Sequence, residues 1–145
     1  MDYRKLLLEK LVALDEIDED HFPVVSLDDY FLGNNQEDSI APNQWGEGRP
    51  PIAEIYRRFK EVEAREDVHG VFVGLHHSWG ESLEDDTWPA AENIHIFSSA
   101  DAETAEQWLA GLCADGIIAG EWPYGKHEAA PLNPPGTHLY SVYWD

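Results

Sequence analysis

The order of the elements predicted along the chain indicates an α+β fold, in which a mostly antiparallel sheet of about four strands packs against a single layer of three or four helices. Two patterns carry this prediction. Residues 50–65 follow the spacing of an amphipathic helix, and residues 68–76 are rich in the β-branched and aromatic residues that favour strands. Helices come first, then a strand pair, one more helix and further strands, which is typical of helices stacked on an antiparallel sheet.

The first third of the chain predicts two helices. Apolar residues recur at helical spacing over residues 2–14. The following run, residues 15–20, is almost entirely acidic, and we expect it to be solvated and irregular because like charges repel. After a short extended segment, Ser26 is the predicted N-cap of a second short helix, which ends at Gly33.

The rest of the chain alternates helices and strands. Residues 34–51 form the longest irregular stretch, and a loop of that length is usually functional or mobile. Beyond it we expect a helix over 50–65, strands over 68–76 and 93–99 that lie side by side, a helix over 101–114, and strands over 117–122 and 138–144. No internal repeat or low-complexity linker interrupts this order, so residues 1–145 are interpreted as one domain.

Charge is the most informative part of the composition. The chain carries 29 Asp and Glu against nine Lys and Arg, a formal net charge of −20. A phosphate-binding surface needs clustered Lys and Arg, so nucleic acid and anionic membranes are excluded as expected partners. Five of the nine basic residues fall between 49 and 65, and none lies between 66 and 125. The charge is therefore strongly asymmetric along the sequence.

Composition also bounds the compartment. Hydrophobic residues make up 43% of the 145 residues, which is enough for a core without a disulfide or a structural metal. Cys113 is the single cysteine, so no internal disulfide can form, and this fits a reducing compartment. No apolar run approaches the length that spans a bilayer. We therefore expect a soluble cytoplasmic protein.

Catalytic motifs are absent from the sequence: it has no phosphate-binding glycine loop, nucleophile elbow or zinc motif. The best metal candidate combines histidines of the two central strands with acids of the loop between them: His76, His77, His95, Glu81, Asp85 and Asp86. Adjacent histidines on a strand point to opposite faces, so only one of His76 and His77 could join a given site. A polar strand end that leads into an acidic loop is the preferred interpretation, with no metal and no cofactor.

Two further candidates are interpreted as structural. Cys113 lies on the expected core edge of the helix over 101–114, in an acidic neighbourhood, whereas a nucleophilic cysteine needs a base and an electropositive setting. Asp28 and Asp29 resemble a catalytic carboxylate pair. In the first turn of a helix, however, such carboxylates satisfy backbone N–H donors and are stabilised by the helix dipole.

Tryptophans gather in or beside the predicted loops. Trp79 and Trp88 flank the acidic loop, and Trp45 and Trp122 lie in other loops. Tryptophan is enriched at the energetic centres of protein interfaces. Aromatic anchors beside a carboxylate-rich loop are typical of a recognition surface. The alternative is that these rings only pack strand ends onto the core.

A small, strongly acidic single domain with loop tryptophans and no catalytic motif resembles the immunity proteins of bacterial toxin systems. The segment Val25–Phe31 and the closing Tyr143-Trp144-Asp145 are also similar to patterns in uncharacterised bacterial single-domain proteins. The first resemblance implies a protein that binds and neutralises a cognate toxin domain, often a basic nuclease. Because immunity proteins have many unrelated folds, it implies no particular site residues.

The resulting hypothesis is an acidic cytoplasmic protein that occludes a basic partner, without enzymatic activity. We expect the acids of the loop to steer the partner and the two tryptophans to anchor it: Glu81, Glu84, Asp85 and Asp86, with Trp79 and Trp88. Two alternatives stay open. One is an interaction module that uses Arg57, Arg58 and Arg65 to bind an acidic partner or a second copy of itself. The other is a metal-dependent hydrolase built on His76, His95 and the carboxylates of residues 81–86.

Overall fold

A five-stranded antiparallel sheet organises the computed structural model, which describes residues 1–44, 46 and 48–144. The strand order is β1-β2-β3-β5-β4, and each neighbouring pair is antiparallel. The strands are β1 (Val24–Ser26), β2 (Val68–Leu75), β3 (Ala91–Ser98), β4 (Gly116–Ala119) and β5 (His138–Tyr143). The α+β class is confirmed, with one strand more than expected, because the short segment before Ser26 pairs with β2.

The helices follow the predicted order. They are α1 (Tyr3–Ile17), α2 (Leu27–Phe31), α3 (Ile52–Glu63) and α4 (Ala102–Gln107), with short 3₁₀ helices at η1 (Pro42–Gln44) and η2 (Trp79–Leu83). Ser26 is the N-cap of α2, as expected, since its Oγ accepts a hydrogen bond from the backbone N–H of Asp29 at 3.1 Å.

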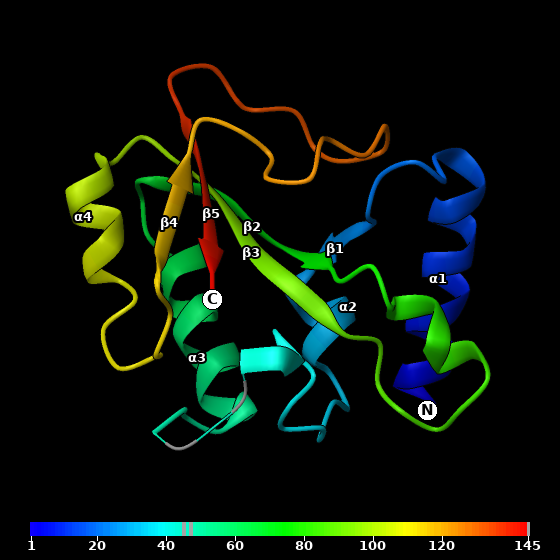
Figure 1. Ribbon diagram of the computed structural model, residues 1–145. Coiled ribbons are helices and arrows are strands. Elements are labelled where there is room, and N and C mark those ends of the chain that lie inside the picture. The colour runs from blue at the N-terminus through cyan, green and yellow to red at the C-terminus, as the bar shows by residue number, and fades with distance from the viewer. Residues whose placement is uncertain (45, 47, 145) are drawn as a thin grey trace.

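One face of the sheet carries the main core. Strand residues alternate between the two faces, and the inward positions of β2, β3 and β5 are large apolar side chains: Val71, Val73, Ile94, Ile96, Tyr140 and Val142. Helices α2 and α3 pack against this face, α3 through Ile55 and Phe59 (Figure 1). The stripe predicted over residues 50–65 is thus the face of α3 that contacts the sheet.

The opposite face is covered by the long segment between β4 and β5, drawn in orange above the sheet in Figure 1. The central residues of this face include Gly74, His95 and Ser141, which are smaller or more polar than those of the core face, together with the aromatic Phe72 and Phe97. The ring of Trp122 lies over His95 and Phe97, with centroids 4.6 and 6.1 Å apart. This second face therefore positions a buried histidine beneath a loop.

Two helices differ in length from the prediction. The first helix continues through Asp15 and Glu16 to Ile17, so the acidic run is helical at its start. The helix expected over 101–114 ends at Gln107 and continues as turns, in which Gly111 and Cys113 adopt positive φ angles of 81° and 58°. A left-handed backbone cannot continue a right-handed helix, so the helix cannot extend to residue 114 as predicted.

None of the helices in the described part of the chain combines the length and the apolar character needed to cross a membrane.

Candidate functional site

The acidic loop between β2 and β3 is fastened to the first turn of α1 by one side chain. Arg4 donates hydrogen bonds from Nε to the carbonyl oxygen of Thr87 at 2.7 Å and from Nη2 to that of Ser82 at 2.6 Å. Nη2 also contacts the carbonyl oxygen of Asp85. The fold therefore brings a cation into a stretch of sequence that has none of its own, and this cation binds the backbone of the loop.

The predicted steering acids remain at the surface. The side chains of Glu81, Glu84 and Asp86 are exposed, and no Lys or Arg among the described residues lies within ion-pair distance of them. Asp85 is also exposed, but its carboxylate accepts a hydrogen bond from the N–H of Thr87 at 3.0 Å and another from the Thr87 hydroxyl. These bonds lower the pKa of Asp85. Three of the four acids are thus available to a partner, and the fourth shapes the loop.

The two tryptophans expected to anchor a partner lie in the core. Trp79 is 9% exposed and Trp88 is 7% exposed, and both belong to the main hydrophobic cluster. The indole N–H of Trp88 donates to the carbonyl oxygen of Tyr30 at 3.1 Å, so its polar group is also satisfied inside the protein. Neither ring is accessible to a partner in this structure. The large apolar side chain that the loop does expose is Leu83, at 53%.

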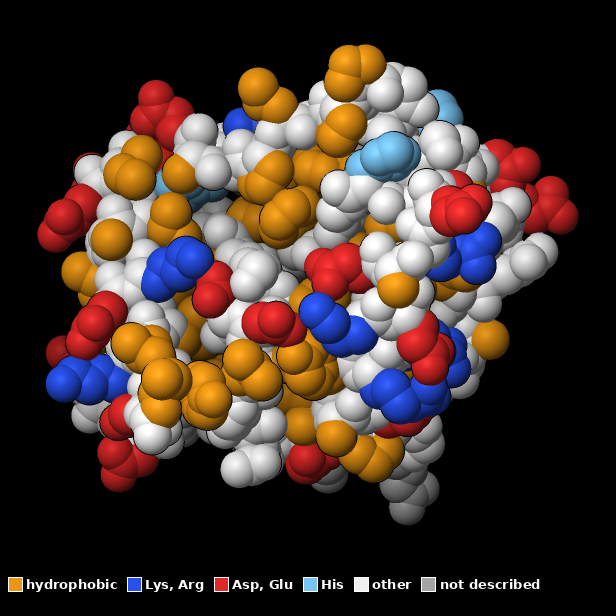
Figure 2. Space-filling model, turned by 180° about the vertical axis from the view of Figure 1, so that it is seen from behind, with side chains coloured by type: hydrophobic (Ala, Val, Ile, Leu, Met, Phe, Trp, Pro, Cys, Tyr) orange, Lys and Arg blue, Asp and Glu red, His pale blue; other side chains and the backbone are white. Residues whose placement is uncertain are grey.

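The basic residues of α3 are neutralised within the chain. Arg57 forms ion pairs with Glu54 and Glu61, and Lys60 pairs with Glu63 at 2.9 Å. On the face seen in Figure 2, most Lys and Arg side chains lie beside Asp or Glu.

The two remaining arginines of this region are engaged as well. Arg65 pairs with Asp67 at 3.0 Å, and Nη1 of Arg58 donates to the carbonyl oxygens of Trp108 and Ala110. The helix predicted to bind an acidic partner or a second copy therefore offers little uncompensated positive charge.

A histidine cluster follows β2. Nε2 of His76 lies 3.4 Å from Oε2 of Glu92, and Nδ1 lies 2.8 Å from Oγ of Ser78. The ring of His77 packs on that of His76 with centroids 4.0 Å apart. Burial, together with the nearby His77, lowers the pKa of His76. The phenol of Tyr124 donates to Oε1 of Glu92 at 3.0 Å, so this carboxylate is held from both sides.

His95 lies elsewhere on the sheet. It pairs in register with Phe72, four residues before His76, and Nδ1 lies 2.7 Å from Oγ of Ser141. Burial lowers the pKa of His95 to about 3, so its ring is neutral at physiological pH. The described residues contain no group of three or more His, Cys, Asp or Glu placed to hold a metal ion. The ligand set of the hydrolase alternative is therefore not brought together.

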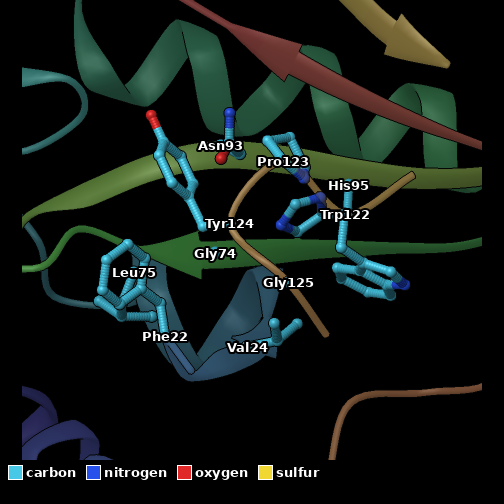
Figure 3. A pocket seen from close by; sticks show the side chains of 10 residues that line it. All are labelled: Phe22, Val24, Gly74, Leu75, Asn93, His95, Trp122, Pro123, Tyr124 and Gly125. Carbon is cyan, nitrogen blue, oxygen red and sulfur yellow. The ribbon is translucent and has the colours of Figure 1, made fainter. Parts of the chain in front are cut away.

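The close-up in Figure 3 shows His95 beside Trp122 at a small cavity, with Tyr124 and Phe22 on its far side. The cavity volume of about 20 Å³ fits one water molecule and no larger ligand. A Cβ atom on Gly74 would lie 2.5 Å from Nε2 of His95. Glycine is needed there because the imidazole occupies the space of a side chain.

The remaining candidates can be placed briefly. Cys113 is exposed and its Sγ donates to the carbonyl oxygen of Gly48 at 3.0 Å, so its predicted position at the core edge is wrong, because the helix ends before it. Asp29 pairs with Lys10 at 2.6 Å, and Asp28 accepts a hydrogen bond from Tyr56 that lowers its pKa. These two carboxylates bind side chains of neighbouring helices. Trp45 lies outside the described residues.

Fold and loop together define a small α+β protein with an acidic loop fastened to its first helix. Residues 2–142 match the family model described as the uncharacterized protein YfbO family, and the chain belongs to this family. The uncharacterized protein YfbO of Escherichia coli (strain K12) is 28% identical over 123 residues, which cover 85% of this chain and 83% of that protein. No solved structure matches the chain.

Proposed function

We propose that this protein is a cytoplasmic binding protein that neutralises a basic protein partner, in the manner of an immunity protein that blocks a toxin domain such as a nuclease. The observation that carries the proposal is the loop of Glu81, Glu84 and Asp86. These carboxylates are exposed, and no described Lys or Arg side chain is within ion-pair distance of them.

Most cations of the described residues are engaged within the protein. Four of them form ion pairs with carboxylates: Lys10, Arg57, Lys60 and Arg65. Four donate to backbone carbonyl oxygens: Arg4, Arg49, Arg58 and Lys126. Arg4 binds the backbone of the loop and its charge lies close to Asp85. None of these eight cations pairs with Glu81, Glu84 or Asp86, whose carboxylates face solvent.

A nuclease must carry a positive groove to hold phosphates, so a carboxylate-rich loop can occupy that groove as a substitute for the substrate. Charge complementarity accelerates the diffusional encounter, with association rates on the order of 10⁸–10⁹ M⁻¹s⁻¹ at low salt. The screening length is about 8 Å at physiological ionic strength, so the steering must weaken as salt is added.

Co-expression with the product of the reading frame next to its gene tests this function. The C-terminal portion of that product is expressed in a host with and without this protein, and survivors are counted. We expect killing that this protein relieves, together with a complex that co-purifies. A matched pair of variants separates the loop from general acidity. The first is Glu81→Gln with Glu84→Gln and Asp86→Asn. The second is Glu103→Gln with Glu106→Gln and Glu121→Gln, at exposed positions in α4 and just after β4.

Only the first variant should lose protection. A harmless neighbouring product, or killing that continues in the presence of this protein, would contradict the immunity function. Equal protection by both variants would mean that the loop acids are not needed for this function.

A further inference from the structure

An apolar groove lies between α1 and η2, next to the steering acids. It is lined by Leu83 of η2 and by residues in and just before α1: Asp2, Arg4, Lys5, Leu8, Glu9 and Val12. Its volume is about 510 Å³. We call it the α1–η2 groove. Leu83 is 53% exposed and Val12 is 38% exposed, although both are apolar.

Arg4 holds the two walls together. Its guanidinium donates to carbonyl oxygens of Ser82, Asp85 and Thr87, which fixes the backbone of the loop against the first turn of α1. Because these donors already bind the loop, Arg4 is poorly placed to pair with the carboxylates at the rim. The groove is therefore built from ordered elements.

The rim of the groove is acidic. Asp2 and Glu9 line it, Glu84 follows Leu83 directly, and Glu16 lies one helical turn beyond Val12 on α1. Among the lining residues, Asp2 and Glu9 are matched by Arg4 and Lys5, so the negative excess around the groove comes from Glu84 and Glu16. An apolar centre with a negative rim complements a segment that is apolar on one face and basic at its edges.

We propose that the α1–η2 groove receives an amphipathic helix with basic flanks that belongs to the protein partner; this inference rests on the function proposed above. The lining residues of α1 run from Lys5 to Val12, so with Asp2 the groove extends about 15 Å along the helix axis. That length accommodates about three turns of a helix, whose apolar side chains at i, i+3, i+4 and i+7 contact Leu8, Val12 and Leu83.

Charge also selects against a second copy of this chain as the occupant. Each copy carries a formal net charge of −20, and the rim of the groove has the same sign. A helix rich in Lys or Arg is attracted by the same field that repels a second copy. The groove thus supplies the apolar contact that the buried Trp79 and Trp88 do not.

Binding of two synthetic peptides tests the proposal. One is an 18-residue helix of leucine and lysine with leucines at i, i+3, i+4 and i+7, and the other has the same composition in an order without an apolar face. Fluorescence anisotropy with this protein measures both affinities. We expect the patterned peptide to bind at least about tenfold more tightly, since both peptides share the charge term and only one offers an apolar face.

Variants locate the binding site of the patterned peptide. Leu83→Ser and Val12→Gln should each weaken it about fivefold or more, whereas Leu132→Ser, which changes an exposed leucine that does not line the groove, should leave it unchanged. Equal binding of the two peptides, or an effect of Leu83→Ser no larger than that of Leu132→Ser, would overturn the proposal.

The same variants distinguish failure of the groove from failure of the proposed function. If the loop acids are needed for protection in the co-expression assay and Leu83→Ser protects as well as the unchanged protein, the groove is wrong and the function stands. If the patterned peptide binds through Leu83 and no protection occurs, the groove stands and the immunity function is wrong.

Discussion

Nε of Arg4 donates a hydrogen bond to the carbonyl oxygen of Thr87 at 2.7 Å, joining the first turn of α1 to a loop more than half the chain away. This contact fixes the loop that carries Glu81, Glu84 and Asp86, and it holds one wall of the α1–η2 groove against the other. Both proposals, steering by the loop and contact in the groove, depend on this hydrogen bond.

Replacing Arg4 with methionine removes the donor for three backbone carbonyl oxygens. The hydrogen bond to Ser82 is partly buried, and those to Thr87 and Asp85 are exposed. We expect Arg4→Met to lower the free energy of unfolding by about 1–2 kcal/mol, since a hydrogen bond contributes about 0.5–1.5 kcal/mol and water can satisfy the exposed acceptors. Lys5→Met removes the same charge at the neighbouring exposed position and should stay within about 0.5 kcal/mol of the unchanged protein. Urea denaturation measures both, and equal stabilities for the two variants would count against a structural role for Arg4.

Trp88 is expected to act through stability. Its ring is 7% exposed and its indole N–H is hydrogen-bonded to the carbonyl oxygen of Tyr30. Trp88→Ala should therefore lower the free energy of unfolding by about 3–5 kcal/mol, as other large core truncations do. Leu132→Ala, at a side chain that is 79% exposed, is the control and should have little effect. If Trp88→Ala is as stable as the unchanged protein and only its affinity for the partner falls, Trp88 anchors the partner and this prediction is wrong.

Acid should destabilise the protein through His95. The pKa of His95 is about 3 in the folded chain and about 6.5 in the unfolded chain. Between pH 6.5 and pH 3, the unfolded chain therefore binds a proton at His95 and the folded chain does not, so stability falls as the pH falls. The contribution of His95 to stability is complete above pH 6.5 and declines toward pH 3. Between pH 6.5 and pH 5 the loss is up to about 2 kcal/mol, at about 1.36 kcal/mol for each pH unit.

The matched variants His95→Gln and His76→Gln isolate that loss. Urea denaturation at pH 7 and pH 5 should show a smaller drop for His95→Gln than for the unchanged protein. His76→Gln should keep the part that His95 contributes, although the lowered pKa of His76 adds a smaller effect of the same sign. If the free energy of unfolding falls as much in His95→Gln as in the unchanged protein, His95 is protonated at pH 5 in the folded chain as well.

Local patterns predicted the elements of this fold well. The stripe over 50–65 is α3, the β-branched run is β2, and Ser26 is the N-cap of α2. Each depends on spacing or capping between residues close in sequence. The early end of α4 was missed because it depends on positive φ angles at Gly111 and Cys113, and helical spacing of the apolar residues continues past it.

The site was harder to predict because its contacts join distant residues. The exposure of Glu81, Glu84 and Asp86 followed from composition, since an acidic, turn-rich loop is solvated. The burial of Trp88 depends on Tyr30, 58 positions earlier. Leu83 was overlooked because one leucine in an acidic loop gives no pattern. A signal did exist, because it is the only large aliphatic residue between Leu75 and Ile94.

The central claim, that the loop carboxylates steer a basic partner, is tested most directly by the association rate. Stopped-flow fluorescence with the purified product of the neighbouring reading frame measures this rate at low and at high salt. The variant carries Glu81→Gln, Glu84→Gln and Asp86→Asn, and leaves Asp85 in place because its carboxylate binds Thr87. The control carries the three matched changes at Glu103, Glu106 and Glu121.

The account predicts a rate about tenfold lower for the loop variant at low salt, a difference that shrinks at high salt, and a much smaller change for the control. An association rate that is the same for the loop variant and the unchanged protein at low salt would contradict it.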